Sequence, residues 1–310
     1  MKLFSKKNEK YIAEFKKSST FASLFTKQSA GVVVQLVRIP ACHAGGRGFE
    51  SLPHRREDRL TVCLFCFYTR NNKCRHKAIQ NCKFPLFLQK IYNAHTMRKI
   101  AVILSGCGTR DGSEIHESTL SLLALDMNGC KYQCFAPDRN QTETVNHFTQ
   151  KQEGEKRNML AEAARIARCD IKPLSAINAA DYDALWIPGG LGAAKNLCSY
   201  FYEGENMKVD SEVEAAIKAF NKSGKPIVAL CIAPVIVAKV LGANVTSGKD
   251  AGTAAKIEAM GGKNTVCNFD EIAYDAEKRV ITAPCYMLDA SISQIWLGIK
   301  KAADKLVELI

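Results

Sequence analysis

The chain has 310 residues, of which 43 are Lys or Arg and 31 are Asp or Glu, so its formal net charge is +12 at pH 7. This length allows two ordinary domains, or one domain with an extension. The 13 cysteines are dispersed along the chain, unlike the dense disulfide framework of a small secreted protein, and no apolar run reaches the roughly 18 residues that a membrane-spanning helix needs. We therefore predict a cytoplasmic protein with no membrane partner.

The positive charge is confined to the first third of the chain. Residues 1–96 contain 18 Lys and Arg against 5 Asp and Glu, whereas residues 97–310 contain 25 and 26. A basic arm could bind nucleic acid or an anionic lipid surface. The remainder is nearly neutral, so the basic isoelectric point says nothing about its partners, and we predict no nucleic-acid partner.

Residues 32–51 resemble the conceptual translation of a tRNA gene. Codons can be chosen for residues 40–45 (PACHAG) that form an anticodon hairpin with GTC at the centre of its loop. Codons for residues 48–51 (GFES) can contain the GTTCGA sequence of a T-loop. We therefore expect residues 1–96 to be a spurious or disordered extension, and the natural start to be Met97.

The same extension offers an alternative interpretation, a zinc module. Cys63 and Cys66 have the spacing of a zinc-ligand pair and are followed by Cys74, His76 and Cys82. Structural zinc sites usually combine two closely spaced pairs, and the second pair here does not have a normal spacing. We therefore predict no metal site.

Residues 97–310 alternate between strand-like and helix-like patterns. Short apolar runs predict strands, and apolar residues at helical spacing predict helices. In chain order we expect a strand at 99–104, a helix at 118–127, a strand at 132–135, a helix at 157–168, a strand at 184–187, a helix at 211–220, a strand at 227–231, a helix at 232–241, an exposed hairpin over 271–283 and a helix at 288–310. This order predicts one α/β domain with a mainly parallel sheet covered on both faces.

Cys231 stands where a predicted buried strand turns sharply into a predicted helix. Pro234 is compatible with the first turn of that helix. Such turns hold nucleophiles at the top of an α/β sheet, and a helix N-terminus favours a thiolate. The alternative is a structural cysteine, because free cysteine is among the most buried residue types.

The loop after the first predicted strand contains Gly106, Gly108 and Gly112. Their spacing is one residue longer than the dinucleotide-binding pattern, and Asp111 would bring a carboxylate close to a bound phosphate. We therefore predict that no nucleotide cofactor binds there, and no other cofactor is expected.

Several motifs together closely resemble the ElbB-type glyoxalases, a branch of the ThiJ/PfpI superfamily. They are 104–108 (LSGCG), 111–117 (DGSEIHE), 134–138 (CFAPD), 146–147 (NH), 157–158 (RN), 187–197 (IPGGLGAAKNL), 231–234 (CIAP) and 284–288 (PCYML). The resemblance covers residues 97–310. It implies a flavodoxin-like sandwich with a mainly parallel sheet, similar to class I glutamine amidotransferases. The family's association with isoprenoid biosynthesis leads to no residue-level prediction.

The resemblance implies that Cys231 is a nucleophile and that a glutamate hydrogen-bonds it. By spacing from Gly112 this partner is Glu117, with Glu114 as the second choice. Burial beside a thiolate would raise the pKa of the carboxyl, and the protonated carboxyl could donate to sulfur. Without the resemblance, Glu117 could simply be an acid that the helix dipole favours in a first turn.

The expected reaction is a cofactor-free conversion of glyoxal to glycolate, of hydro-lyase type. The Cys231 thiolate adds to an aldehyde carbon, and Glu117 moves a proton between carbon and oxygen through an enediol. The resulting thioester is then hydrolysed. The oxyanion would be bound by N–H groups in the segment of Gly189 and Gly190 and by the N–H of Ile232.

The motifs contain further histidine and cysteine residues. His147 could serve the substrate pocket or tie down a loop, and His116 could point away from the site. Cys285 is interpreted as a packing residue, since relatives often have a small residue there. Cys107 could approach the site and resolve an oxidised Cys231.

Two other functions remain open. One is a redox or stress sensor, in which a partner reads the reversible oxidation of an exposed, acidic Cys231. The other is an amidotransferase-like subunit that delivers ammonia, which should carry a late histidine, although none follows His147. Ile232 also stands where many members of the superfamily have histidine, which disfavours a Cys-His protease or amidase. A homodimer is a further possibility.

Overall fold

The computed structural model describes residues 98–310. The tRNA-like segment, the zinc motif and Met97 lie outside the described residues. The strands of the main sheet are β1 (Lys99–Ile103), β2 (Lys131–Ala136), β5 (Ile171–Pro173), β6 (Ala184–Ile187), β7 (Ile227–Leu230), β10 (Ala273–Asp275) and β11 (Val280–Ala283). The helices are α5 (Ile115–Met127), α6 (Met159–Ile166), α7 (Leu191–Asn196), α8 (Tyr200–Glu203), α9 (Ser211–Lys222), α10 (Pro234–Leu241), α11 (Ala251–Ala259) and α12 (Ile292–Leu309). Short 3₁₀ turns are η2 (Leu174–Ala176), η3 (Ala179–Asp181), η4 (Gly204–Asn206) and η5 (Cys285–Met287).

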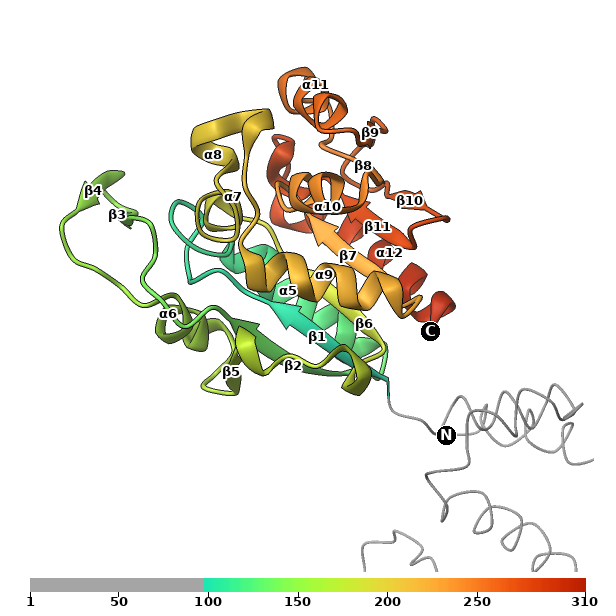
Figure 1. Cartoon of the computed structure of the whole chain (residues 1–310), viewed down its shortest axis with the longest axis horizontal. Helices are drawn as coiled ribbons and strands as arrows, with labels where there is room; N and C mark the ends of the chain where they lie inside the picture. Colours follow the sequence, from blue (N-terminus) through green and yellow to red (C-terminus); the bar gives the residue numbers. More distant parts are fainter. Residues whose placement is uncertain (1–97) are drawn as a thin grey trace, which may run out of the picture. The chain divides into compact units, whose positions relative to one another are not determined.

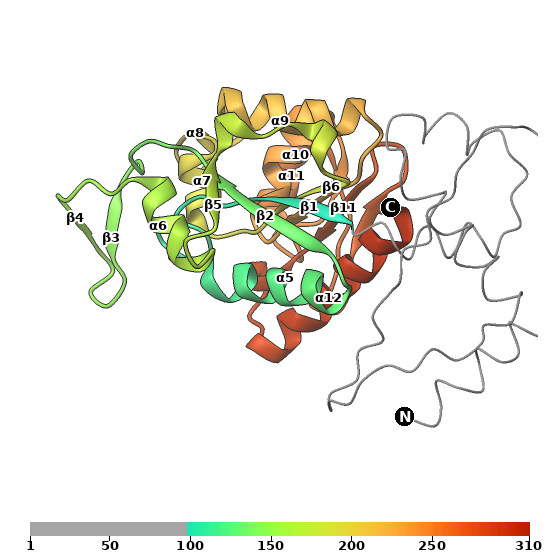
Figure 2. The same cartoon turned by 90° about the horizontal axis from the view of Figure 1, so that it is seen from below.

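The described residues form a seven-stranded sheet in the order β10-β11-β7-β6-β1-β2-β5. Every neighbouring pair is parallel except β10 and β11, which form an antiparallel hairpin at one edge. Helices α5 and α12 pack together on one face, and α9 and α10 cover the other (Figures 1 and 2). This is the expected flavodoxin-like sandwich, and it brings the carboxyl ends of β1, β6, β7 and β11 to one edge of the sheet.

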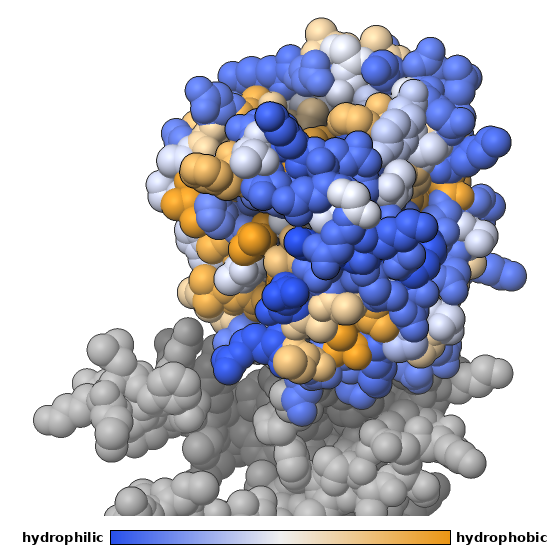
Figure 3. Space-filling model, turned by 90° about the vertical axis from the view of Figure 1, so that its left-hand side faces the viewer, coloured by the Kyte–Doolittle hydropathy of each residue, from blue (hydrophilic) through white to orange (hydrophobic). Residues whose placement is uncertain are grey.

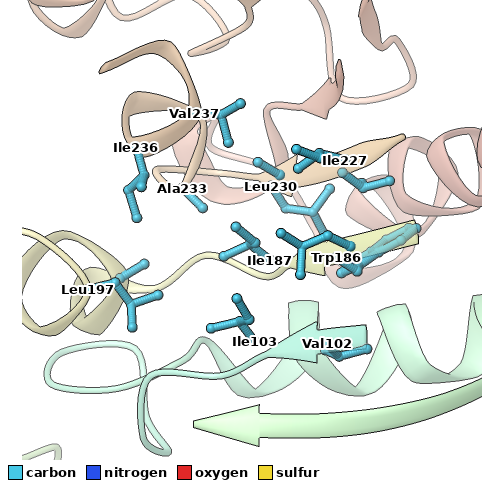
Figure 4. Close-up of a cluster of buried hydrophobic side chains, with 14 of the residues drawn as sticks. Val102, Ile103, Trp186, Ile187, Leu197, Ile227, Leu230, Ala233, Ile236 and Val237 are labelled. Atoms are coloured by element: carbon cyan, nitrogen blue, oxygen red, sulfur yellow. The ribbon is translucent and has the colours of Figure 1, made fainter. Parts of the chain in front are cut away.

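The core is formed where the central strands meet the helices. Strands β6 and β7 are buried along their whole length, as the strands of a covered parallel sheet must be. Figure 4 shows Trp186 and Ile187 of β6 between side chains of β1 and of the β7–α10 segment. The Trp186 indole is fully buried, and its Nε1 donates to the Ser121 Oγ of α5 at 2.9 Å. This bond fixes α5 against the sheet while satisfying the one polar group of the indole.

The structure confirms each predicted strand and helix, with ends shifted by a few residues. One part of the hairpin expectation is wrong. The turn between β10 and β11 is largely exposed, but β11 is buried at every residue because it pairs with β7 inside the sheet. Helix α10 begins at Pro234 instead of residue 232, since Cys231 and the two residues after it form the turn.

Two small sheets were not predicted. They are β3 (Thr144–Asn146) with β4 (Lys151–Glu153), and β8 (Asn244–Val245) with β9 (Lys263–Asn264). Strands of two or three residues are too short to show a periodic pattern. The β3–β4 hairpin projects from the body of the domain (Figures 1 and 2). The surface seen from that side is mostly hydrophilic, with separate apolar areas between (Figure 3).

Within residues 98–310, every helix is too short or too polar to cross a lipid bilayer.

Candidate active site

Cys231 occupies a sharp turn at the carboxyl end of β7. Its φ is +59°, in the left-handed region that side chains other than glycine rarely adopt. The Cys231 N–H donates to the Ala283 carbonyl at 2.9 Å, which ties the turn to the neighbouring strand β11. The side chain is almost entirely enclosed, with the residue 8% exposed. A strained backbone held in this way is a common feature of functional sites.

Glu117 reaches the same place from the first turn of α5. It is 0% exposed. Its Oε2 accepts from the Gly189 N–H at 3.0 Å, and its Oε1 accepts from the Tyr286 N–H at 3.3 Å. The carboxyl also hydrogen-bonds the Cys231 thiol. Glu117 is therefore both the first-turn acid of a helix and the partner of the cysteine.

Gly189 lies between the thiol and the carboxyl. A Cβ at this position would stand 2.4 Å from the Cys231 Cβ and 2.7 Å from the Glu117 Oε2, closer than real Cβ contacts. Only a residue without a side chain lets the β6 end approach both groups. The Gly189 N–H is committed to Glu117 and so is not free to bind a substrate oxygen.

Two backbone donors surround the sulfur. The N–H groups of Gly190 and Ile232 both hydrogen-bond Cys231 and act to lower its pKa. Gly190 has a φ of +101°, and a Cβ there would meet the Glu114 nitrogen at 2.4 Å, so its conformation also depends on glycine. The geometry therefore brings together the two donors that the sequence suggested for an oxyanion.

The backbone donors at the turn favour a Cys231 thiolate, as expected from the sequence, but burial outweighs them. Burial raises the pKa of the Cys231 thiol well above its usual range, and the charge of Glu117 adds to this effect. The two backbone donors oppose the shift without overcoming it. The protonated thiol is thus the resting form, because a thiolate at this position is cut off from water.

Burial also raises the pKa of the Glu117 carboxyl, to about 7, with the charge of Glu114 as the next cause. Hydrogen bonds from Cys231, Tyr286 and Gly189 act in the opposite direction but are weaker than the effect of burial. The carboxyl and the thiol therefore titrate as one coupled unit. Below pH 7 the carboxyl and the thiol are both protonated. Above pH 7 one proton remains, and the carboxyl oxygen and the sulfur share it.

Glu114 lies beside this pair, whereas the contacts of His147 are with the β3–β4 hairpin and the loop after β1. The Glu114 carboxylate caps α5 by accepting from the Glu117 N–H at 2.7 Å. The imidazole of His147 bonds the Arg110 N–H at 3.2 Å and the Val145 carbonyl at 3.0 Å. His147 thus ties the β3–β4 hairpin to the loop after β1, and neither of its hydrogen bonds goes to the cysteine–glutamate pair.

His116 is exposed, and its Nδ1 pairs with the Tyr286 hydroxyl at 2.8 Å. This contact holds η5 over the start of α5, because the Tyr286 N–H also bonds Glu117.

The loop after β1 is clamped by α7. Asn196 donates from its side chain to the carbonyls of Ser105 at 3.1 Å and Asp111 at 2.8 Å. Gly192 donates from its backbone to the Gly112 carbonyl at 3.0 Å. The Gly-Gly-Leu-Gly motif and its asparagine therefore position the segment that leads into α5 and Glu117.

Cys285 is a buried core residue, as the sequence predicted, and it also lies beside the cysteine–glutamate pair. It begins η5 after β11, is 1% exposed, and has a φ of +44°. Its sulfur lies near the Cys231 N–H, and the charges of both Glu117 and Cys231 affect its pKa. Its position two residues beyond a buried strand was the signal that could have placed it here. Cys107 instead lies among the charges of Glu162, Arg165 and Asp111.

Among residues 98–310, the acidic, histidine and cysteine side chains form no group of three that could hold a metal ion.

Several known proteins are similar to this chain. The human glutamine amidotransferase-like class 1 domain-containing protein 3, mitochondrial, is 43% identical over 222 residues, which are 68% of this chain and 83% of the human protein. The rat ES1 protein homolog, mitochondrial, is 41% identical, over 68% of this chain and 84% of the rat protein. A crystal structure from Ehrlichia chaffeensis, described as an isoprenoid biosynthesis protein with an amidotransferase-like domain, matches with 36% identity and a TM-score of 0.64. It covers 68% of this chain and 100% of its own.

A scan of protein-family models finds no match. The predicted cytoplasmic location finds no support in the two curated relatives, whose names place them in mitochondria.

Replacing Gly189 by alanine should destabilise the domain by about 1–3 kcal/mol, because the added methyl group collides with Cys231 and Glu117. Urea unfolding would measure the loss. Gly154→Ala is the matched control, since a Cβ there meets nothing within 4 Å, and it should change the free energy of unfolding by less than about 0.5 kcal/mol. Equal stability of the two variants would contradict the close approach at Gly189.

The buried Glu117 should make the free energy of unfolding depend on pH. Between the pKa of an unfolded glutamate, about 4.3, and the value of about 7 in the folded protein, the folded state binds a proton that the unfolded chain has lost. The stability from this proton is complete below pH 4.3 and declines as the pH rises through 7. Glu117→Gln stays neutral, so its stability relative to the wild type should rise by roughly 3 kcal/mol between pH 4 and 8.

Urea titrations at a series of pH values would measure this difference. Glu308→Gln, which changes a carboxylate that is 66% exposed, serves as the control. A difference between wild type and Glu117→Gln that does not vary with pH would contradict the burial of an ionisable pair.

Proposed function

The chain belongs to the family of glutamine amidotransferase-like class 1 domain and ES1 proteins, and from this premise we propose that it is a cofactor-independent glyoxalase of the ElbB type that converts glyoxal to glycolate. The observation that carries the proposal is the hydrogen bond between the Glu117 carboxyl and the Cys231 thiol, in a buried site with two backbone donors at the sulfur. The sequence motifs shared with ElbB-type proteins favour the same activity.

The first step joins the sulfur to one aldehyde carbon of glyoxal. The Glu117 carboxylate takes the thiol proton as the sulfur attacks, so the energetic cost of a free buried thiolate is avoided. The carbonyl π electrons move to oxygen and form a hemithioacetal oxyanion. The N–H groups of Gly190 and Ile232 are close enough to the sulfur to stabilise this charge.

The second step moves hydrogen between the two carbons. Glu117 first passes the thiol proton to the oxyanion, so the hemithioacetal is neutral and Glu117 is a carboxylate again. The carboxylate then removes the proton from the carbon bonded to sulfur, and the electrons of that C–H bond form a C=C bond. The second oxygen takes over the hydroxyl proton, which gives an enediolate. Returning the proton to the second carbon yields a thioester of glycolate. A water molecule then cleaves the C–S bond, which releases glycolate and restores the thiol. The sum is glyoxal plus water giving glycolate, without an external oxidant or reductant.

The raised pKa of Glu117 suits this double role. A carboxyl with a pKa of about 7 both accepts and returns a proton readily near neutral pH. The enclosure of Cys231, only 8% exposed, favours a substrate as small as a two-carbon dialdehyde.

Hydrolase or amidotransferase chemistry is less well supported. Both would use a histidine as the base for the cysteine. The His116 imidazole bonds Tyr286, and the His147 imidazole bonds the loop after β1. Glu117 is the titratable side chain that hydrogen-bonds Cys231.

The full chain should consume glyoxal and release glycolate. Cys231→Ala should show no turnover, because it lacks the nucleophile. Glu117→Gln should lose about 10²- to 10⁴-fold in kcat, because the amide cannot carry the proton. NMR would quantify the glycolate formed from glyoxal. Methylglyoxal would be assayed separately as a second aldehyde substrate.

Cys198→Ser is the control, because this buried thiol bonds the Ala193 carbonyl away from the pair. It should retain wild-type turnover. A folded Cys231→Ala variant that is as active as the wild type, or a folded wild type without turnover of either aldehyde, would refute the proposal.

A further inference from the structure

Cys231 and Cys285 end two neighbouring parallel strands on the same side of the sheet. Leu230 of β7 and Ala283 of β11 are paired in register. Cys231 is one residue beyond this pair and Cys285 two residues beyond it. Parallel strands stand about 4.8 Å apart, and the bond from the Cys231 N–H to the Ala283 carbonyl shows that this spacing persists past the strand ends.

The chain turns at both cysteines as it leaves the sheet. Both residues have positive φ, +59° and +44°, so the chain bends at each of them as it leaves its strand. The Cys285 sulfur lies near the Cys231 N–H, and the two thiols interact electrostatically. An offset of one residue between neighbouring parallel strands, about 4.8 Å across and about 3.3 Å along, corresponds to a Cα separation of about 5.8 Å. This lies within the range of about 4.4–6.8 Å that disulfides join. Both thiols are free in this structure.

We propose that Cys231 and Cys285 form a reversible disulfide when the protein meets a hydroperoxide. This modification site goes beyond the glyoxalase proposal and does not depend on it. Cys231, which is more exposed than Cys285 (8% against 1%), is the sulfur that meets the peroxide. Cys285 acts as the resolving thiol from inside the protein.

The oxidation requires only the peroxide, the two thiols and the Glu117 carboxylate. The Cys231 thiol passes its proton to the Glu117 carboxylate, and its sulfur attacks one peroxide oxygen. The O–O bond breaks, and the leaving oxygen takes up a proton as water or alcohol, while Cys231 becomes a sulfenic acid. The Cys285 sulfur then attacks the Cys231 sulfur and displaces the hydroxyl group, which leaves as water with the Cys285 proton. Two thiols are oxidised to one disulfide, and one peroxide is reduced.

Glu117 is placed to serve both halves of this sequence. Its carboxyl hydrogen-bonds Cys231 and also accepts from the N–H of Tyr286, the residue after Cys285. The disulfide would occupy the nucleophile and so stop any aldehyde chemistry while it lasts. It would also protect Cys231 from the further oxidation to sulfinic acid that a thiol reductant does not reverse.

The test treats the full 310-residue chain with one equivalent of hydrogen peroxide, blocks free thiols with N-ethylmaleimide in denaturant, and identifies tryptic peptides by mass. Trypsin leaves the Lys225–Pro226 bond intact, so Cys231 falls in peptide 223–239 and Cys285 in peptide 280–300, each with one cysteine. We expect these peptides to be joined in the wild type and separated by dithiothreitol, with both thiols recovered. The readout is a peptide mass, so it is independent of glyoxal turnover.

Cys285→Ser and Cys107→Ser are the paired variants. Cys285→Ser should lose the joined peptide and carry two extra oxygens on Cys231, without recovery by dithiothreitol. Cys107→Ser should keep the joined peptide, because Cys107 lies among other partners. The proposal is overturned if wild-type Cys231 stays reduced, if it gains oxygens while Cys285 remains a free thiol, or if it is joined to another cysteine.

Discussion

A carboxyl group and a thiol share a site that water barely reaches, and the rest of the domain serves to hold them there. Each group alone would be costly to ionise at this depth. Together they keep at least one proton between them up to high pH, because burial raises the pKa of both. Gly189 makes the contact possible, and the Tyr286 and Gly189 N–H groups fix the carboxyl in place. The catalytic potential of the site follows from this shared proton.

The topology explains how four distant segments meet. The parallel order places the ends of β1, β6, β7 and β11 at one edge, and each end contributes one part of the site. The loop after β1 leads to Glu117, and β6 ends in the two glycines. Strand β7 ends in Cys231, and β11 ends near Cys285. Because β7 and β11 are neighbours in the sheet, Cys285, just past β11, lies close to Cys231, just past β7.

The sequence was sufficient to predict the α/β sandwich and the place of Cys231, since apolar runs ending in Pro-Gly-Gly and Cys-Ile-Ala-Pro mark buried strands and turns. Glu117 could be chosen over Glu114 only through the family resemblance, because both residues fit the start of one helix. The raised pKa of Cys231 was not foreseeable. The effect of a helix N-terminus on a thiol pKa can be expected from the sequence, but the burial of the thiol cannot. Burial depends on how closely η5 and the glycines cover the sulfur. The closeness of Cys285 to Cys231 was not predicted, because a position just past a strand indicates the sheet edge but not which strand end is its neighbour.

The most direct measurement of the central claim is an infrared pH titration of the Glu117 carboxyl, taken as the difference between wild type and Glu117→Gln. The account predicts a protonated carboxyl band at pH 6 that disappears with a midpoint near pH 7. In Cys231→Ala the band should shift in frequency, because its hydrogen-bond partner is gone. A Glu117 carboxylate already fully ionised at pH 5, or a band indifferent to the loss of Cys231, would contradict the account.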